Sequence, residues 1–128
     1  MQHQYGFTLT EILVSLCLLS LIVLGLNAAQ VMSVRATHAA YHLSVAEQQL
    51  YSMAERLSIL HGNQLDESVI EWNNQNRVVL PQGKGEVDGI FPDYHLSIRW
   101  GKSDTSSCDQ LSIGESGCLE FPYHVSTA

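Results

Sequence analysis

The chain opens with a long run of apolar residues. From Phe7 to Val34 almost every position is apolar, and Glu11 is the single Asp, Glu, Lys or Arg among the first 34 residues. No proline occurs before Pro81, so nothing in the sequence removes a helical backbone donor along this stretch. Because about 20 apolar residues cross a bilayer, the run is long enough to form a membrane-spanning helix.

The next stretch, from Arg35 to Leu60, mixes polar and apolar residues. Its apolar positions recur at steps of three or four, which places them on one face of a helix. We therefore predict one continuous helix from Phe7 to Leu60, stopping at Gly62, with a stripe in its second half that packs against the rest of the protein. The stripe consists of Ala36, Ala39, Leu43, Ala46, Leu50, Met53, Leu57 and Leu60.

Beyond Gly62 the pattern changes to short runs separated by turns. The cluster 81–85 (Pro-Gln-Gly-Lys-Gly) predicts a turn shaped by Pro81, Gly83 and Gly85. Residues 94–100 and 119–125 each alternate between apolar and polar residues, which predicts two strands. An antiparallel pair with one apolar face would cover the helical stripe, so the predicted fold class is α+β.

Charge divides the chain in the same place as hydropathy. The whole protein has a net charge of −7, and the residues after Val34 hold twelve acids against six bases, a net charge of −6. We therefore expect a polar leader (residues 1–6), a membrane half of the helix (7–34) and a soluble acidic head (35–128). The acidity counts against binding to nucleic acids or to anionic lipids, since both require clustered bases.

The three cysteines differ in their surroundings. Cys17 lies inside the apolar run and is expected to behave as a small buried hydrophobe. Cys108 and Cys118 flank a loop of nine residues, which a disulfide would close with a gain of about 2–3 kcal/mol. The disulfide requires an oxidising compartment, and the alternative is two free thiols in a reducing one.

Other chemistry is weakly represented. His38 and His42 are four residues apart on the predicted helix, but two ligands do not make a zinc site without a third. No Ser-His-Asp order, glycine-rich phosphate loop or catalytic carboxylate pair can be recognised. We therefore expect neither an enzyme nor a protein that carries a metal or cofactor.

The sharpest local signal is the segment 5–11 (Tyr-Gly-Phe-Thr-Leu-Thr-Glu). A carboxylate at the head of a membrane helix is costly to bury without a partner. If the chain were cut after Gly6, Phe7 would gain a free amino group four residues from Glu11, and this amine or a neighbouring subunit's could pair with the carboxylate. The plainer alternative is that Glu11 marks the water boundary of an ordinary anchor.

The order Gly6-Phe7-Thr8-Leu9-Thr10-Glu11 before an apolar helix resembles the class III signal sequence of type IV prepilins and type II secretion pseudopilins. The resemblance implies cleavage after Gly6 by a prepilin peptidase, N-methylation of Phe7 and a role for Glu11 in subunit assembly. It also implies a pilin-like fold, a single pass through the bacterial inner membrane with the head in the periplasm, and later a place in a surface filament. The leader departs from the family because it lacks Lys and Arg, so orientation by positive charge rests on the terminal amine and His3.

A second resemblance rests on the order of four segments in the head, with Trp72 and Trp100 expected in the core. These segments resemble the PilV group of type IV pilus minor pilins: 46–57, Trp72, 80–87 and 94–100. The resemblance implies a minor pilin that primes, joins or modifies a type IV pilus. Its partners would be the prepilin peptidase, the major and other minor pilins, and the assembly platform of the inner membrane.

Two alternatives stay open. The first is a minor pseudopilin of a type II secretion system, which assembles in the same way. The second is an ordinary membrane-anchored periplasmic binding domain, or a secreted protein with a cleaved signal peptide. A conventional cut near Ala28 is disfavoured because Leu26 stands where a small residue is needed.

Overall fold

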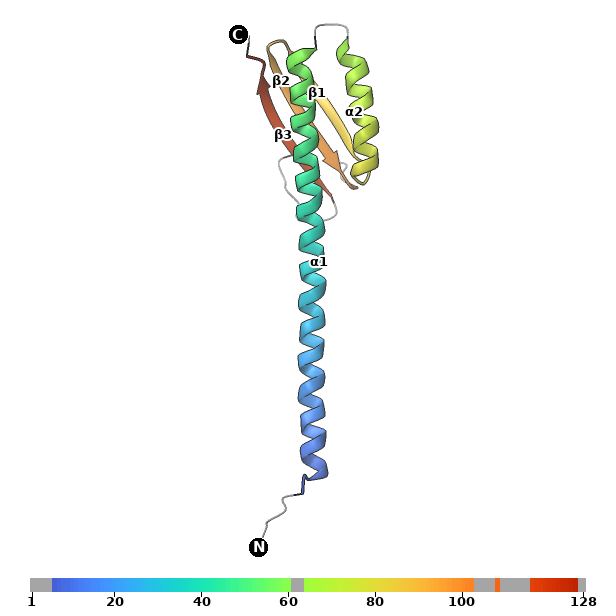
Figure 1. Ribbon diagram of the computed structural model, residues 1–128, viewed down its shortest axis with the longest axis vertical. Coiled ribbons are helices and arrows are strands. Elements are labelled where there is room, and N and C mark those ends of the chain that lie inside the picture. The colour runs from blue at the N-terminus through green and yellow to red at the C-terminus, as the bar shows by residue number, and fades with distance from the viewer. Residues whose placement is uncertain (1–5, 61–63, 103–107, 109–115, 127–128) are drawn as a thin grey trace. The chain divides into compact units, whose positions relative to one another are not determined.

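A computed structural model describes residues 6–60, 64–102, 108 and 116–126 of the chain. Its elements, in chain order, are α1 (Leu9–Ile59), α2 (Leu65–Val79), β1 (Lys84–Ile90), β2 (Asp93–Trp100) and β3 (Gly117–His124) (Figure 1). The chain divides into two units, residues 1–35 and 36–128. The long N-terminal helix and the small antiparallel sheet form the predicted α+β, pilin-like architecture.

The helix α1 begins two residues later than predicted. Phe7 and Thr8 precede it, and the Thr8 carbonyl accepts hydrogen bonds from the amides of Glu11 (3.0 Å) and Ile12 (3.3 Å). At the other end the Leu60 amide still donates to the Arg56 carbonyl (3.0 Å), but the helix ends at Ile59. The predicted stop at Gly62 lies outside the described residues.

The apolar stripe that was predicted on α1 is buried only from Ala46 to Leu57. Ala46, Leu50, Met53 and Leu57 are buried in the core of the head, together with the neighbouring Ala54. The last residue of the predicted stripe, Leu60, is half-buried. The first three are exposed or half-buried: Ala36, Ala39 and Leu43. The stripe prediction was therefore too long at its beginning.

The sheet has the strand order β1-β2-β3 and is antiparallel throughout. Strands β2 and β3 are the predicted pair, with Ile98 opposite Leu119 and Leu96 opposite Phe121. Leu96, Ile98 and Trp100 are buried against the helices, as the alternation predicted. Both α1 and α2 therefore cover the same face of the sheet in the head (Figure 1).

Two elements were missed at the sequence level. The helix α2 lies where only short runs separated by turns were predicted, and β1 begins inside the predicted turn cluster. Pro81 and Gly83 do belong to the turn, where the Gly83 amide donates to the Leu80 carbonyl (3.1 Å). Gly85 does not, because it lies in β1 beneath the ring of Trp72.

The outer face of the sheet, which points away from the helices, is polar. Glu86 lies between Lys84 (2.7 Å) and Arg99 (3.4 Å), and Asp93 contacts His124 across the strand pair (2.6 Å). The hydrogen bond from Lys84 and the charges of both bases lower the pKa of Glu86, and this effect outweighs the desolvation that raises it. The core of the head therefore lies on one side of the sheet only.

Candidate functional site

The predicted cleavage junction lies just outside the first helix. Gly6, Phe7 and Thr8 have no regular secondary structure, and α1 begins at Leu9. The Phe7 side chain is 80% exposed, and a Cβ added to Gly6 would meet no atom within 4 Å. Peptidases cut exposed, non-helical backbone most readily, so the bond between Gly6 and Phe7 is presented in a form that a peptidase can bind.

The residues that follow fix where the helix starts. The Thr8 carbonyl accepts the first two amide bonds of α1, and the Thr8 and Thr10 hydroxyls lie 3.1 Å apart. Further along, the Ser15 hydroxyl donates to the Glu11 carbonyl at 2.8 Å. These hydroxyl groups thus satisfy one another or the backbone, as a helix in a lipid environment requires.

Glu11 lies in the first turn of α1, close to the positive end of the helix dipole. It lines one shallow hollow together with Phe7, Ile12, Ser15, Leu16 and Leu19. The structure therefore brings Phe7 and Glu11 to the same side of the chain, although Phe7 is not itself helical. The pairing of a Phe7 amine with the Glu11 carboxylate stays a prediction about the cleaved chain.

The comparison with known families concerns this same segment. Residues 1–27 match the family described as the prokaryotic N-terminal methylation motif. The N-terminus is that of a type IV pilin-like protein. The motif implies processing by a prepilin peptidase and assembly with other pilins. No curated protein and no solved structure matches this chain.

The pilin-like N-terminus continues into a surface that requires covering. In α1 the apolar side chains from Ile12 to Val34 are exposed, and the helix is long and apolar enough to cross a membrane. Cys17, predicted to be a buried hydrophobe, is also exposed in the isolated chain. Its burial therefore depends on lipid or on neighbouring helices. Together, the helix and the motif fit membrane anchoring.

The two remaining cysteines are joined. A disulfide links Cys108 and Cys118, with the Cα atoms 5.2 Å apart, as the loop length predicted. Cys118 is in β3, opposite Arg99 of β2, so the bridge ties residue 108 to the start of the last strand. The remaining residues between the two cysteines, apart from Ser116 and Gly117, lie outside the described part of the chain.

The head offers little to a metal ion. Among residues 6–60, 64–102, 108 and 116–126, no three His, Cys, Asp or Glu side chains are placed to hold one. His38 and His42 both lie on α1, with the His42 ring against Tyr41 (5.7 Å between centroids). Within the described residues, the histidine pair therefore has no third ligand beside it. The sequence did not indicate a second feature, a groove between α1 and β3, because it joins residues far apart in the chain.

Proposed function

We propose that this protein is a minor pilin that primes, joins or modifies a type IV pilus after a prepilin peptidase cuts between Gly6 and Phe7. The observation that carries the proposal is the methylation motif, placed at an exposed junction directly before an apolar helix. The role is structural: the head provides a distinct surface, and no catalytic step is assigned to it.

The apolar half of α1 supplies the driving force for assembly. Its side chains are exposed in the isolated chain, and exposure of apolar surface to water costs about 25 cal/mol per Å². Lipid covers this surface in the inner membrane, and equivalent helices of other subunits would cover it in a filament. Transfer from one environment to the other therefore keeps the helix out of water throughout.

Cleavage acts as an assembly switch in this account. It removes the leader and leaves the apolar helix in place, so the protein stays anchored. It also frees the amine of Phe7, which is then methylated, on the same side of the chain as Glu11. Within an apolar filament core the Glu11 carboxylate needs a cationic partner, and the amine of the same or a neighbouring subunit would provide it and set the register between helices.

The resemblance of segments in the head to the PilV group supports a pilus over a secretion system. The segments that resemble the PilV group meet in one core, where the end of α1, Trp72, β1 and β2 pack together. A minor pseudopilin of a type II secretion system is the second candidate, because the methylation motif supports it equally well. An ordinary anchored binding domain would not need a motif of this kind.

Deletion of the gene tests the choice between these candidates. We expect the deletion strain to lose surface pili and twitching motility while type II secretion stays at the wild-type level, and we expect the intact gene to restore both pilus phenotypes. Normal piliation combined with a loss of secreted enzymes would assign the protein to the secretion system instead.

A further inference from the structure

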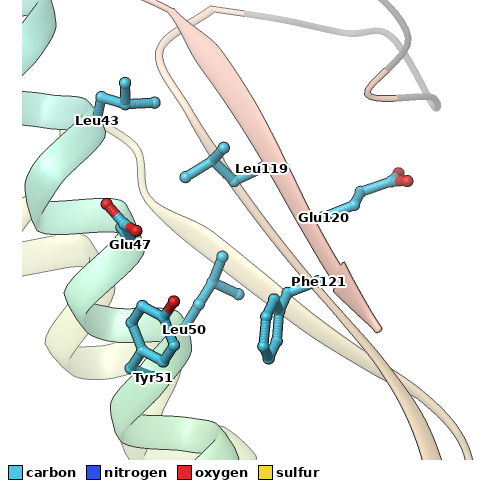
Figure 2. A pocket seen from close by; sticks show the side chains of 7 residues that line it. All are labelled: Leu43, Glu47, Leu50, Tyr51, Leu119, Glu120 and Phe121. Atoms are coloured by element: carbon cyan, nitrogen blue, oxygen red, sulfur yellow. The ribbon is translucent and has the colours of Figure 1, made fainter. Parts of the chain in front are cut away.

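A groove in the head runs between the C-terminal half of α1 and the last strand, β3. The side chains of Leu119 and Phe121 point from β3 toward α1, whereas Glu120 points away (Figure 2). Glu120 instead approaches His95 on the outer face of the sheet, at 4.0 Å. The residues lining the groove are Leu43, Glu47, Leu50, Tyr51, Leu119, Glu120 and Phe121.

One carboxylate belongs to the helical wall of this groove. Glu47 is four residues from both Leu43 and Tyr51, so all three share one face of α1 (Figure 2). No described residue forms an ion pair with Glu47, which is exposed. An acidic side chain among apolar neighbours is thus open to a cation from outside the chain.

Aromatic rings complete the groove beside Glu47. Tyr51 and Phe121 meet edge to face, with ring centroids 5.6 Å apart, and Phe121 stacks on Tyr123 at 6.3 Å. Tyr51 is 57% exposed and Phe121 is half-buried, so ring faces remain open to a ligand. Aromatic faces attract cations, and the attraction strengthens when water is excluded.

We propose that this groove binds an arginine side chain presented by a different protein. A planar guanidinium can stack on the exposed Tyr51 ring while it donates hydrogen bonds to the Glu47 carboxylate, and its aliphatic stem can cover Phe121 and Leu119. Arginine fits better than lysine because a guanidinium is more weakly hydrated than an ammonium and stacks on aromatic rings.

The charge of the chain argues against a second copy as the occupant. Residues 35–128 carry a net charge of −6, so two heads repel each other. Three of the six bases already pair with carboxylates of their own chain: Arg56 with Glu71, and Lys84 and Arg99 with Glu86. A basic partner complements this surface, whereas a second acidic head does not.

This inference rests on the proposed function in one respect: the arginine would come from another subunit or assembly protein. It adds the chemistry by which the head selects that neighbour. Contacts between apolar helices carry little charge specificity, so a charge-specific contact between heads would distinguish one partner from another.

Site-specific crosslinking in cells tests the proposal with the full-length chain. The photoreactive residue p-benzoylphenylalanine replaces Leu43 at the rim of the groove, which leaves Glu47 and both rings in place. We expect a covalent adduct with a different protein, attached within a few residues of an arginine. Glu47→Gln should reduce the adduct about tenfold, the equivalent of about 1.4 kcal/mol.

A matched variant controls for loss of charge alone. Glu55 is also an exposed glutamate of α1, but it does not line the groove, so Glu55→Gln should leave the adduct unchanged. Exchange of charges supplies a second check: Glu47→Arg should abolish the adduct, and replacing the partner's arginine with glutamate should restore it. The Cys108–Cys118 disulfide, mapped in each variant, reports that the head has folded.

Several outcomes would overturn the inference. They are the absence of any adduct, attachment to a segment without arginine, equal yields for Glu47→Gln and Glu55→Gln, and an adduct with a second copy of this chain. The N-terminus is measured in the same samples. A methylated Phe7 together with an adduct that Glu47→Gln leaves unchanged would overturn the groove inference alone. An uncut Met1 together with an adduct that Glu47→Gln reduces would overturn the proposed function alone.

Discussion

Trp72 and Gly85 show how two residues hold the head together. Trp72 is fully buried, and its Nε1 donates to the Gln49 carbonyl of α1 at 3.0 Å. Its ring lies so close to β1 that a Cβ on Gly85 would clash with the Cζ3 carbon of the ring. One tryptophan therefore joins α1, α2 and β1, and only a glycine leaves it room.

A methyl group at this position should destabilise the head. We expect Gly85→Ala to cost about 1–3 kcal/mol, because overpacking displaces the buried ring. Tryptophan fluorescence during thermal unfolding in detergent micelles measures the loss, since both tryptophans are buried in the head. Gly25→Ala is the matched control: its Cβ meets no atom within 4 Å, and the head should unfold at the wild-type temperature. Equal unfolding temperatures for all three proteins would refute this packing account.

Glu86 makes the stability of the head depend on acidity. Its pKa in the folded protein is lowered from the ordinary 4.5, chiefly by the hydrogen bond from Lys84. The contribution to stability is therefore fully present above pH 4.5 and is lost as the pH falls through the lowered pKa.

The corresponding variant is Glu86→Gln, which should lower the unfolding temperature at pH 7 and progressively less below pH 4.5. The measurement is the difference in unfolding temperature between variant and wild type, recorded from pH 7 to pH 3. For comparison, Glu55 lies outside the group formed by Lys84, Glu86 and Arg99. The difference in unfolding temperature between Glu55→Gln and wild type should therefore not change in this way with pH. A difference between Glu86→Gln and wild type that grows toward low pH would contradict stabilisation by the ionised Glu86 carboxylate.

At the scale of elements, the sequence predicts those helices and strands that a local pattern of residues determines. The steps of three and four from Ala46 to Leu57 and the alternation from Tyr94 to Trp100 predicted α1 and β2, because each element buries one face. The junction around Gly6 and Phe7 was equally visible, since residue type and spacing define it. The start of α1 was misplaced by two residues, because the Thr8 carbonyl and not Phe7 opens the helix.

The missed strand and the groove depend on contacts between distant residues. Strand β1 contains Gly85, Asp88 and Gly89, which have low strand propensity, and pairing with β2 is what holds it extended. The groove could not be predicted for the same reason, since it joins residues 43–51 to residues 119–121.

Helix α2 did carry a readable signal. Leu65, Val69 and Trp72 are spaced by four and three residues and pack on the core, with two acids in the first turn and Arg77 in the last. The many polar residues between them obscured this periodicity.

The attachment of α2 to the sheet can be tested through Asn73. Its amide nitrogen donates to the Gly85 carbonyl (2.9 Å), and its amide oxygen accepts from the Gly85 amide (2.7 Å). We expect Asn73→Ala to cost about 1–3 kcal/mol, because both backbone groups lose their partner in a half-buried place. Hydrogen exchange should then accelerate in α2 and β1.

Asn74→Ala serves as the control, because Asn74 is the exposed neighbour on the same helix. Its amide exchange should match the wild type. The same protection of α2 in both variants would show that Asn73 does not hold the helix to β1.

At the scale of the whole molecule, the chain combines a unit that needs covering with a head that folds around its own core. Residues 1–35 hold almost no charge, whereas the disulfide, the charged pairs and the buried tryptophans all belong to residues 36–128. The exceptions in the first unit are Arg35, at its end, and Glu11. In these apolar surroundings the Glu11 carboxylate is stabilised only if it pairs with a cation.

Glu11→Ala tests this use directly. We expect cleavage to continue, because the Gly6–Phe7 junction is unchanged, while the amount in sheared filaments falls about tenfold or more. The reason is that removal of one partner from a buried ion pair costs about 3–5 kcal/mol. Immunoblots of sheared filaments against membranes measure the change. Thr10→Ala is the control, and wild-type incorporation of Glu11→Ala would remove the argument for charge pairing.

The central claim is that the chain is cut after Gly6 and methylated on Phe7. Mass spectrometry of the N-terminal peptide, taken from the protein in its native membrane, tests it most directly. The account predicts an N-terminal methylated Phe7 with the apolar helix retained. An intact Met1, or a mature N-terminus near Ala28, would contradict it.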